Sequence, residues 1–288
     1  MKNRGIVFKL TSLILITSII FFLVVSNHNA KKTRSIFKGN LRDSAENLSY
    51  STLNKIESIL RAVEKIPQQI AISLEGSSYS KEDLLRLIRQ TVENNPEIYG
   101  STIAFEPYMF DPDALYFAPY YHKHEGEIKF TYIGNESYKY FSWDWYKVPK
   151  EKNKSVWSEP YFDEGAGNII MSTYSVPFYQ NVGGEKKLLG IVTADISLAW
   201  LQEMVSSIKI AETGYAFLIS KKGTLITHPR QDLVMNHTIF SLANEFNQPE
   251  LHELGKNMIN GESNFISKKH LFTGKDAWLF HAPLPSNG

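Results

Sequence analysis

The sequence predicts an α+β protein in which a membrane span and a long helix lead into two units with central antiparallel sheets. Three observations predict this architecture. An uncharged apolar run lies near the N-terminus, a stretch with helical spacing follows it, and from Tyr99 onward the apolar period changes to two. Turn signals of Gly, Pro, Asn and Asp separate the period-two runs, which is typical of antiparallel strands.

Composition narrows the classes of function. The chain has 288 residues, 43% of them hydrophobic, which is enough to bury one large core or two ordinary ones. A formal net charge of +1 and the lack of a basic stripe argue against nucleic-acid binding. Since cysteine is absent, disulfides, thiolate metal sites and cysteine nucleophiles are excluded.

The N-terminal apolar run predicts a membrane anchor. Counted over residues 6–26 around Lys9, it reaches the roughly 20 residues that a spanning helix needs. A signal peptide is the alternative, but residues 26–30 make a poor cleavage site. We therefore expect residues 1–27 to form a cytoplasmic tail and an uncleaved transmembrane helix, with the rest of the chain outside the cytoplasm. The basic residues that follow the span leave its orientation unsettled by charge alone.

Residues 28–75 are predicted to form a long stalk helix. Apolar residues recur at helical spacing between residues 35 and 66, and the helix is expected to stop near Pro67. The apolar stripe could pair with a second copy as a homodimer, or it could pack along its own domain. The sequence leaves both possibilities open.

Residues 76–208 are predicted to form the first sheet-centred unit. Ser80 and Asp83 form a capping box that opens a helix over residues 81–93. Strands are expected at residues 99–106 and 128–133, and a central hairpin at residues 171–179 and 188–196 turns at Gly183 and Gly184. A helix over residues 198–208 is expected to leave the sheet.

Residues 209–288 repeat the strand-rich pattern in shorter form. Strands are expected at residues 214–220 and 224–229, a helix at residues 249–259, and further strands at residues 263–267 and 277–282. Because no closing helix follows, we expect this second unit to be incomplete.

Residues 138–195 concentrate aromatic rings beside acidic side chains. Aromatic walls with a few polar groups can enclose an organic ligand. A half-buried sheet face explains the same composition, and from composition alone that plainer interpretation is favoured. No cofactor and no metal is predicted: we interpret His122 and His124 as a solvated pair on an exposed turn, and the acidic pairs at residues 111–113 and 163–164 as turn chemistry.

Several motifs in this order resemble the double-Cache sensor domains of bacterial transmembrane receptors. They are Trp145-Tyr146, Trp157-Ser158-Glu159-Pro160-Tyr161, Ser175-Val176-Pro177, residues 190–198 and residues 214–219. The resemblance covers nearly everything from about Ser35 onward. It implies two PAS-like modules outside the cell, the first membrane-distal and the second membrane-proximal. The runs at residues 143–146 and 161–165 look most like sensors that precede phosphatase or histidine-kinase output domains.

The resemblance also implies a ligand site in the distal module. Many members bind amino acids through a Tyr, an Arg-x-Trp-Tyr run, a later Tyr and an Asp. These positions fall on Tyr138, Trp145 and Tyr146, Tyr161 and Asp195, with Trp143 in place of the arginine. Since Trp cannot grip a carboxylate as Arg does, an amine, a betaine-like cation or an uncharged ligand fits better than an amino acid.

We therefore expect Trp143, Trp145, Tyr146, Tyr161 and Asp195 to converge on one cavity, with Tyr138 and Asp144 at its rim. The predicted function is an extracytoplasmic small-molecule sensor domain of a membrane signalling receptor. Two alternatives stay open. One is a cell-envelope enzyme that uses Asp144, Glu159 or Asp163, and the other is a membrane-anchored binding module without output.

Overall fold

The computed structural model describes residues 3–208, 210 and 212–284. The chain divides into two compact units, Met1–Ser51 and Thr52–Gly288. One helix, α1 (Asn3–Gly76), runs through the boundary between them. The predicted span over residues 6–26 lies in α1, and its side chains at residues 6, 7, 9–12 and 14 lie outside the described set. Within the described residues, no helix has the length and apolar character needed to cross a bilayer.

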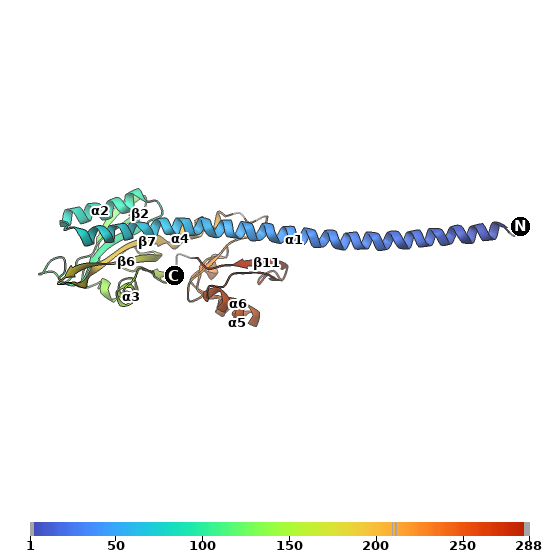
Figure 1. The fold of residues 1–288 in the computed structure, drawn as a ribbon. Helices are drawn as coiled ribbons and strands as arrows, with labels where there is room; N and C mark the ends of the chain where they lie inside the picture. The colour runs from blue at the N-terminus through green and yellow to red at the C-terminus, as the bar shows by residue number, and fades with distance from the viewer. Residues whose placement is uncertain (1–2, 209, 211, 285–288) are drawn as a thin grey trace. The chain divides into compact units, whose positions relative to one another are not determined.

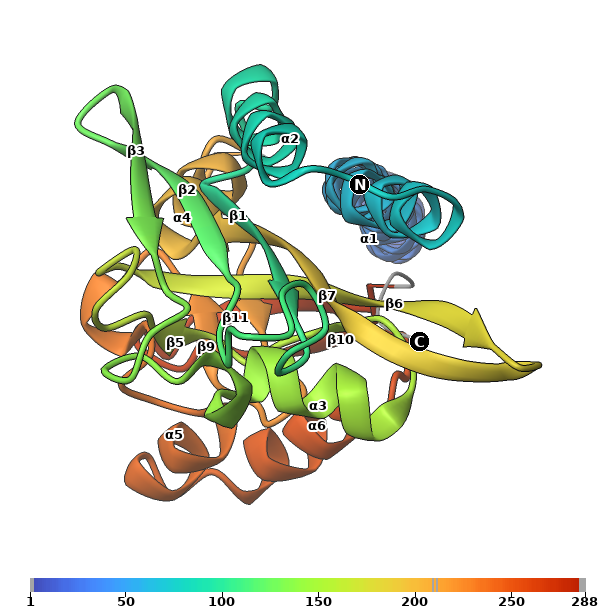
Figure 2. The same cartoon turned by 90° about the vertical axis from the view of Figure 1, so that its left-hand side faces the viewer.

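Strands β1 to β7 form one antiparallel sheet in the order β3-β2-β1-β7-β6-β4, and β5 pairs separately with β6. We call this the large sheet; Figures 1 and 2 show it from two sides. Its strands are β1 (Gly100–Phe105), β2 (Pro119–His124), β3 (Glu127–Tyr132), β4 (Val156–Trp157), β5 (Tyr161–Phe162), β6 (Ile170–Val182) and β7 (Glu185–Ser197).

The predicted hairpin is confirmed as β6 and β7, which lie in the interior of the large sheet. Gly183 and Gly184 make its turn with φ of +62° and +93°, a backbone region that favours glycine. The predicted capping box is confirmed too. It opens α2 (Lys81–Asn94), where the Ser80 side chain accepts from the backbone of Asp83 and the Asp83 side chain accepts from the backbone of Ser80.

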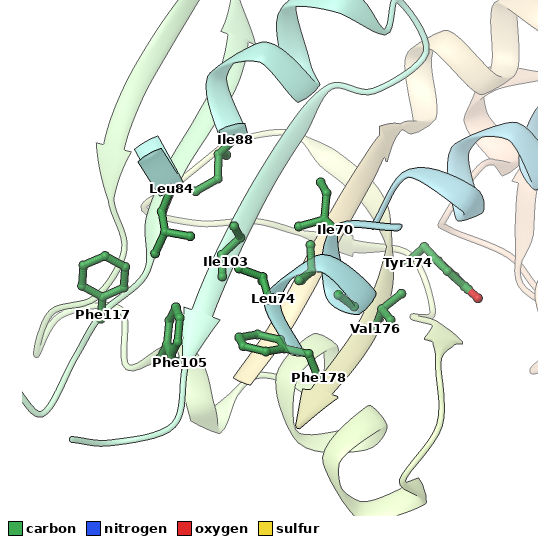
Figure 3. Packing of buried hydrophobic residues seen from close by; sticks show 12 residues of the cluster. Ile70, Leu74, Leu84, Ile88, Ile103, Phe105, Phe117, Tyr174, Val176 and Phe178 are labelled. Atoms are coloured by element: carbon green, nitrogen blue, oxygen red, sulfur yellow. The ribbon is translucent and has the colours of Figure 1, made fainter. Parts of the chain in front are cut away.

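Helices cover both faces of the large sheet. The C-terminal part of α1 and helix α2 lie on one face, and α3 (Asp144–Lys152) lies on the other (Figure 2). Figure 3 shows Ile70 and Leu74 of α1 and Ile88 of α2 directed at Ile103 and Val176 of the sheet. We call this side of the sheet the helix face.

Two predictions about helix and strand positions are wrong. Helix α1 continues past Pro67 to Gly76, because Ile70, Ala71 and Leu74 beyond the proline are buried in the core of the helix face. That burial offsets the lost backbone hydrogen bond of the proline. The turn expected around His122 is strand β2, paired on both sides by β1 and β3. His122 is therefore buried, with 5% of its surface exposed, and only His124 is exposed.

The chain after β7 adds no strand to the large sheet in the part that the structure describes. Two separate two-stranded sheets, β8-β9 and β10-β11, follow instead. The elements of this part are α4 (Leu198–Ser206), β8 (Leu218–Ile219), β9 (Leu225–Thr227), a 3-10 turn (Gln231–Leu233), α5 (Ile239–Glu245), α6 (Pro249–Ile259), β10 (Asn264–Lys269) and β11 (Asp276–His281). Another 3-10 turn, Tyr140–Ser142, precedes α3. The module boundary near residue 209 stays a prediction, because both sides of it lie in one compact unit.

Candidate functional site

Strand alternation separates the helix face from the face that carries the candidate site. On β6, Tyr174 and Val176 contribute to the core of the helix face, so Thr173 and Ser175 lie on the opposite face. On β7, Val192 contributes to that core and Ile191 to the opposite one. We call the opposite side the ring face, because aromatic residues between Tyr138 and Tyr146 cover it.

A row of paired residues crosses the ring face from β2 to β6. His122 pairs with Gly100, Gly100 with Asp195, and Asp195 with Thr173. Gly100 is required here, because a Cβ at this position would lie 2.1 Å from the hydroxyl oxygen of Tyr120. The missing side chain therefore gives Tyr120 room to reach Asp195 across the sheet.

Asp195 is the centre of the site. Its side chain is 2% exposed and accepts hydrogen bonds from Thr173, Tyr120 and Thr193. Burial, and then the nearby Asp163, raise the pKa of Asp195 to about 8, although its hydroxyl donors act in the opposite direction. The site therefore holds a carboxyl group that titrates near neutral pH.

Asp163 is a second buried carboxylate, 1% exposed, in the loop that follows β5. Its Oδ1 accepts from the hydroxyl of Tyr138, and its Oδ2 accepts from the backbone N–H of Gly167 at 2.8 Å. Burial raises the pKa of Asp163, and these two hydrogen bonds oppose the shift. Among the described residues, no Lys, Arg or His forms an ion pair with Asp163 or Asp195.

Aromatic rings surround this pair of carboxylates. The ring of Trp143 stacks on Tyr138 with centroids 5.0 Å apart and lies 5.7 Å from the ring of Tyr161. The Trp143 indole N–H donates to the backbone oxygen of Tyr138 at 3.0 Å, and the Tyr161 hydroxyl bonds to Thr173 Oγ1 at 2.8 Å. The indole of Trp145 donates to the Tyr138 hydroxyl at 3.3 Å.

The backbone between residues 139 and 146 sets these positions. Lys139 adopts a left-handed conformation with φ of +47°, and the 3-10 turn Tyr140–Ser142 leads to Trp143, the N-cap of α3. Trp145 and Tyr146 then lie on the buried side of the helix. Asp144, in its first turn, is exposed, where a negative charge suits the helix N-terminus.

The structure brings some of the seven predicted site residues together and places others apart. Tyr138, Trp143, Trp145, Tyr161 and Asp195 are joined through hydrogen bonds or ring contacts that involve Asp163 and Thr173. Tyr138, expected at the rim, is buried. The Tyr146 ring contacts Trp145, with centroids 5.7 Å apart, but its hydroxyl donates to Glu106 at 2.7 Å, and Glu106 also accepts from Lys150. Asp144 is exposed and faces solvent, apart from this group.

Sequence reasoning missed three contributors to the site: Tyr120, Thr173 and, as a ligand-site residue, Asp163. The sequence pattern of Asp163 is that of a turn residue or an enzyme carboxylate, and its signal as a site residue is the nearby Tyr161. Tyr120 lies on a strand that the sequence did not predict, and Thr173 became relevant only through its pairing with Asp195. Together the residues form an acidic, ring-lined group suited to holding an organic cation.

Comparison with known proteins finds a family match for part of the chain. Residues 84–203 match the family of the first PDC sensor domain of methyl-accepting chemotaxis protein-like receptors. The chain is 25% identical over 82% of its length to the methyl-accepting chemotaxis protein PscA of Pseudomonas syringae pv. tomato, of which it covers 34%. It thus spans about a third of that relative.

Solved structures agree with the sequence match. The extracellular domain of mmHK1S-Z3, a protein assigned as a histidine kinase, superposes with a TM-score of 0.72 and 28% identity, over 84% of this chain and 89% of that one. The ligand-binding domain of the Pseudomonas aeruginosa amino acid chemoreceptor PctC, solved with GABA, shares the fold with a TM-score of 0.57 and 19% identity, over 85% and 94% of the two chains. These matches are to sensor domains and not to enzymes. They confirm the resemblance to double-Cache sensors, and we conclude that residues 84–203 carry a sensor domain similar to those of chemoreceptors and histidine kinases.

Proposed function

We propose that this sensor domain binds a small organic ammonium compound on the ring face of the large sheet. The observation that carries the proposal is the pair of buried carboxyl groups, Asp163 and Asp195, which form no ion pair with any described residue. A buried charge is costly unless it is paired. A ligand with an ammonium group supplies the missing positive charge.

The rings beside the carboxylates favour the same ligand. Trp143, Tyr138 and Tyr161 are in mutual contact, and aromatic faces attract organic cations. Solved relatives of this fold hold GABA, glutamine, arginine or asparagine, and each of these compounds carries an ammonium group. The shared chemistry is therefore a cation held by a carboxylate.

Trp143 favours an amine over an amino acid. The family resemblance predicts an arginine at this position to bind the ligand carboxylate, and the Trp143 ring is instead stacked on Tyr138. An amine or a betaine-like cation needs no such arginine. A thermal-shift screen of the purified chain should therefore pair each amino acid with the amine formed by loss of its α-carboxylate. We expect the amine of a pair to raise the melting temperature more; greater stabilisation by the amino acids would contradict this assignment.

The finer context of the receptor belongs to the same proposal. Residues 6–26 would anchor the chain in the membrane. In this segment the described side chains include large apolar residues that are exposed: Leu15, Ile16, Ile19, Ile20, Phe21, Phe22, Leu23, Val24 and Val25. The part after residue 27 would lie outside the cytoplasm, with residues 76–208 as the distal module and residues 209–288 as the proximal one. Ligand binding would favour one packing of the distal module and so bias α1.

A further inference from the structure

Ser175 carries an unexplained hydroxyl group on the ring face. The residue lies on β6, is 0% exposed, and pairs with Thr193 of β7 and Val156 of β4. Among the described residues, its Oγ has no hydrogen-bond partner. A buried hydroxyl without a partner costs about 1–3 kcal/mol, so native proteins keep few of them.

Two threonine hydroxyls near Ser175, those of Thr173 and Thr193, have hydrogen-bond partners. Thr173, two residues earlier on the same strand, bonds to Tyr161 and to Asp195. Thr193 accepts from the backbone N–H of Thr102 at 3.1 Å and also bonds to Asp195. The unsatisfied Ser175 hydroxyl thus lies beside two threonine hydroxyls that bond to the central Asp195, and it has no partner of its own among the described residues.

We propose that Ser175 is a specificity-determining residue whose hydroxyl binds an uncharged oxygen-bearing group of the ligand. This inference rests on the proposed function, because the same ligand would place its ammonium group at Asp195. Residues two apart on a strand are separated by about 7 Å, so a single small molecule can span the level of Thr173 and Ser175. A lone hydroxyl compensates poorly for burying a carboxylate, which makes a hydroxyl or amide group the better match.

The ligand class that follows is an amine with a second, neutral polar group a few bonds from its nitrogen. Amino alcohols are the simplest members. An alkylamine in which a methyl group replaces the hydroxyl has nearly the same shape but leaves Ser175 unsatisfied, and a site with a polar group left unpaired discriminates against such an analogue.

The test measures binding of matched probes by calorimetry. The probes are 3-amino-1-propanol, 4-amino-1-butanol and 5-amino-1-pentanol, each with the alkylamine that carries a methyl group instead of the hydroxyl. In the wild-type chain we expect the best amino alcohol to bind about three- to tenfold more tightly than its alkylamine, as one net hydrogen bond gives. Ser175→Ala should erase this preference.

Stability provides a second readout that does not depend on the probe. Ser175→Ala should raise the melting temperature of the ligand-free chain, because it removes an unsatisfied buried hydroxyl. The matched control is Ser172→Ala. Ser172 donates to the backbone oxygen of Ser158 at 2.9 Å, so its loss should lower the melting temperature and keep the probe preference.

The outcomes separate the inference from the proposed function. If amines bind but wild type and Ser175→Ala show the same preference, the role of Ser175 is wrong while the ammonium site stands. A lower melting temperature of ligand-free Ser175→Ala would also overturn the inference. If none of the amines binds the wild-type chain, the proposed function fails, and the role of Ser175 fails with it.

Discussion

The carboxyl group of Asp195 couples ligand binding to pH. Its folded-state pKa of about 8 lies above its ordinary value of 3.8, so between these values the folded chain holds a proton that the unfolded chain has lost. The contribution of Asp195 to the free energy of unfolding is therefore largest below pH 3.8, and it falls as the pH rises toward about 8. At neutral pH the Asp195 carboxyl group of the ligand-free chain is therefore mostly protonated.

An ammonium ligand requires the carboxylate form, so binding at neutral pH should expel this proton. We expect close to one proton released per ligand at about pH 7, and an affinity that rises up to tenfold per pH unit until the pH reaches the pKa. Calorimetry in two buffers with different ionisation enthalpies measures the release. Asp195→Asn should abolish it, and a wild-type chain that binds amines without releasing a proton would contradict the assignment.

Asp195→Asn should weaken binding of an amine by about 2–5 kcal/mol, because it removes the charge partner of a buried cation. The fold should survive, since the change is nearly isosteric. Asp144→Asn is the matched control: Asp144 is exposed, and we expect its loss to change affinity little. If Asp195 serves only as a hydrogen-bond acceptor for Thr173, Tyr120 and Thr193, its substitution would shift the melting temperature and leave amine affinity unchanged.

At the scale of elements, strand β6 connects the candidate site to α1. Thr173 contacts Asp195 on the ring face, and the next residue, Tyr174, accepts a hydrogen bond from Gln68 of α1 at 2.9 Å on the helix face. Trp157 of β4 donates to Glu64 of α1 at 2.7 Å. A shift of β6 on ligand binding would therefore move or break the hydrogen bond between Tyr174 and Gln68 of α1.

Helix α4 connects the large sheet to the chain that follows. Its N-cap, Ser197, ends β7, and Gln202 makes two hydrogen bonds to the backbone of His228, donating to its oxygen at 3.0 Å and accepting from its N–H at 2.9 Å. Gln202→Ala should destabilise the chain after residue 214 by about 1–3 kcal/mol, because it leaves these backbone groups unpaired.

Hydrogen exchange measures this effect by region. In Gln202→Ala we expect faster exchange around β9, at residues 225–227, with β6 and β7 unchanged and amine affinity retained. Gln202→Glu, which keeps the acceptor and loses the donor, should give a smaller effect. Equally faster hydrogen exchange in the large sheet would show that the two hydrogen bonds between Gln202 and His228 do not act locally.

At the scale of the whole molecule, the proposed topology predicts labelling from outside the cell. Because the chain has no cysteine, Lys186→Cys introduces a single thiol at an exposed position of the β6–β7 hairpin. We expect it to react with a membrane-impermeant thiol reagent in intact cells. Labelling that appears only after lysis would place this hairpin in the cytoplasm.

A homodimer through α1 is the second expectation at this scale. Ile36, Phe37, Leu41 and Leu48 are exposed large apolar residues of the helix, and burying them against a second copy would remove this surface from water. Leu41→Cys should cross-link between copies in membranes under mild oxidation, whereas Lys186→Cys, on the hairpin, should not. Equal cross-linking of both variants would indicate random collision.

The sequence by itself determined the elements whose signals are local. A capping box fixes α2, two glycines fix the turn between β6 and β7, and alternation assigns the strands of that hairpin. The family motifs also pointed to the rings around Tyr138 and to Asp195. These features follow from residues close together in the chain, where propensity and spacing act directly.

Only the tertiary structure decided the features that depend on distant contacts. Burial of Ile70 and Leu74 against the sheet carries α1 past Pro67, and pairing on both sides turns the segment around His122 into β2. The approach of Asp163 to Asp195 and the unsatisfied hydroxyl of Ser175 likewise arise where β5, β6 and β7 meet. Charge, burial and hydrogen-bond satisfaction are set by neighbours in space, and the order of residues alone does not contain them.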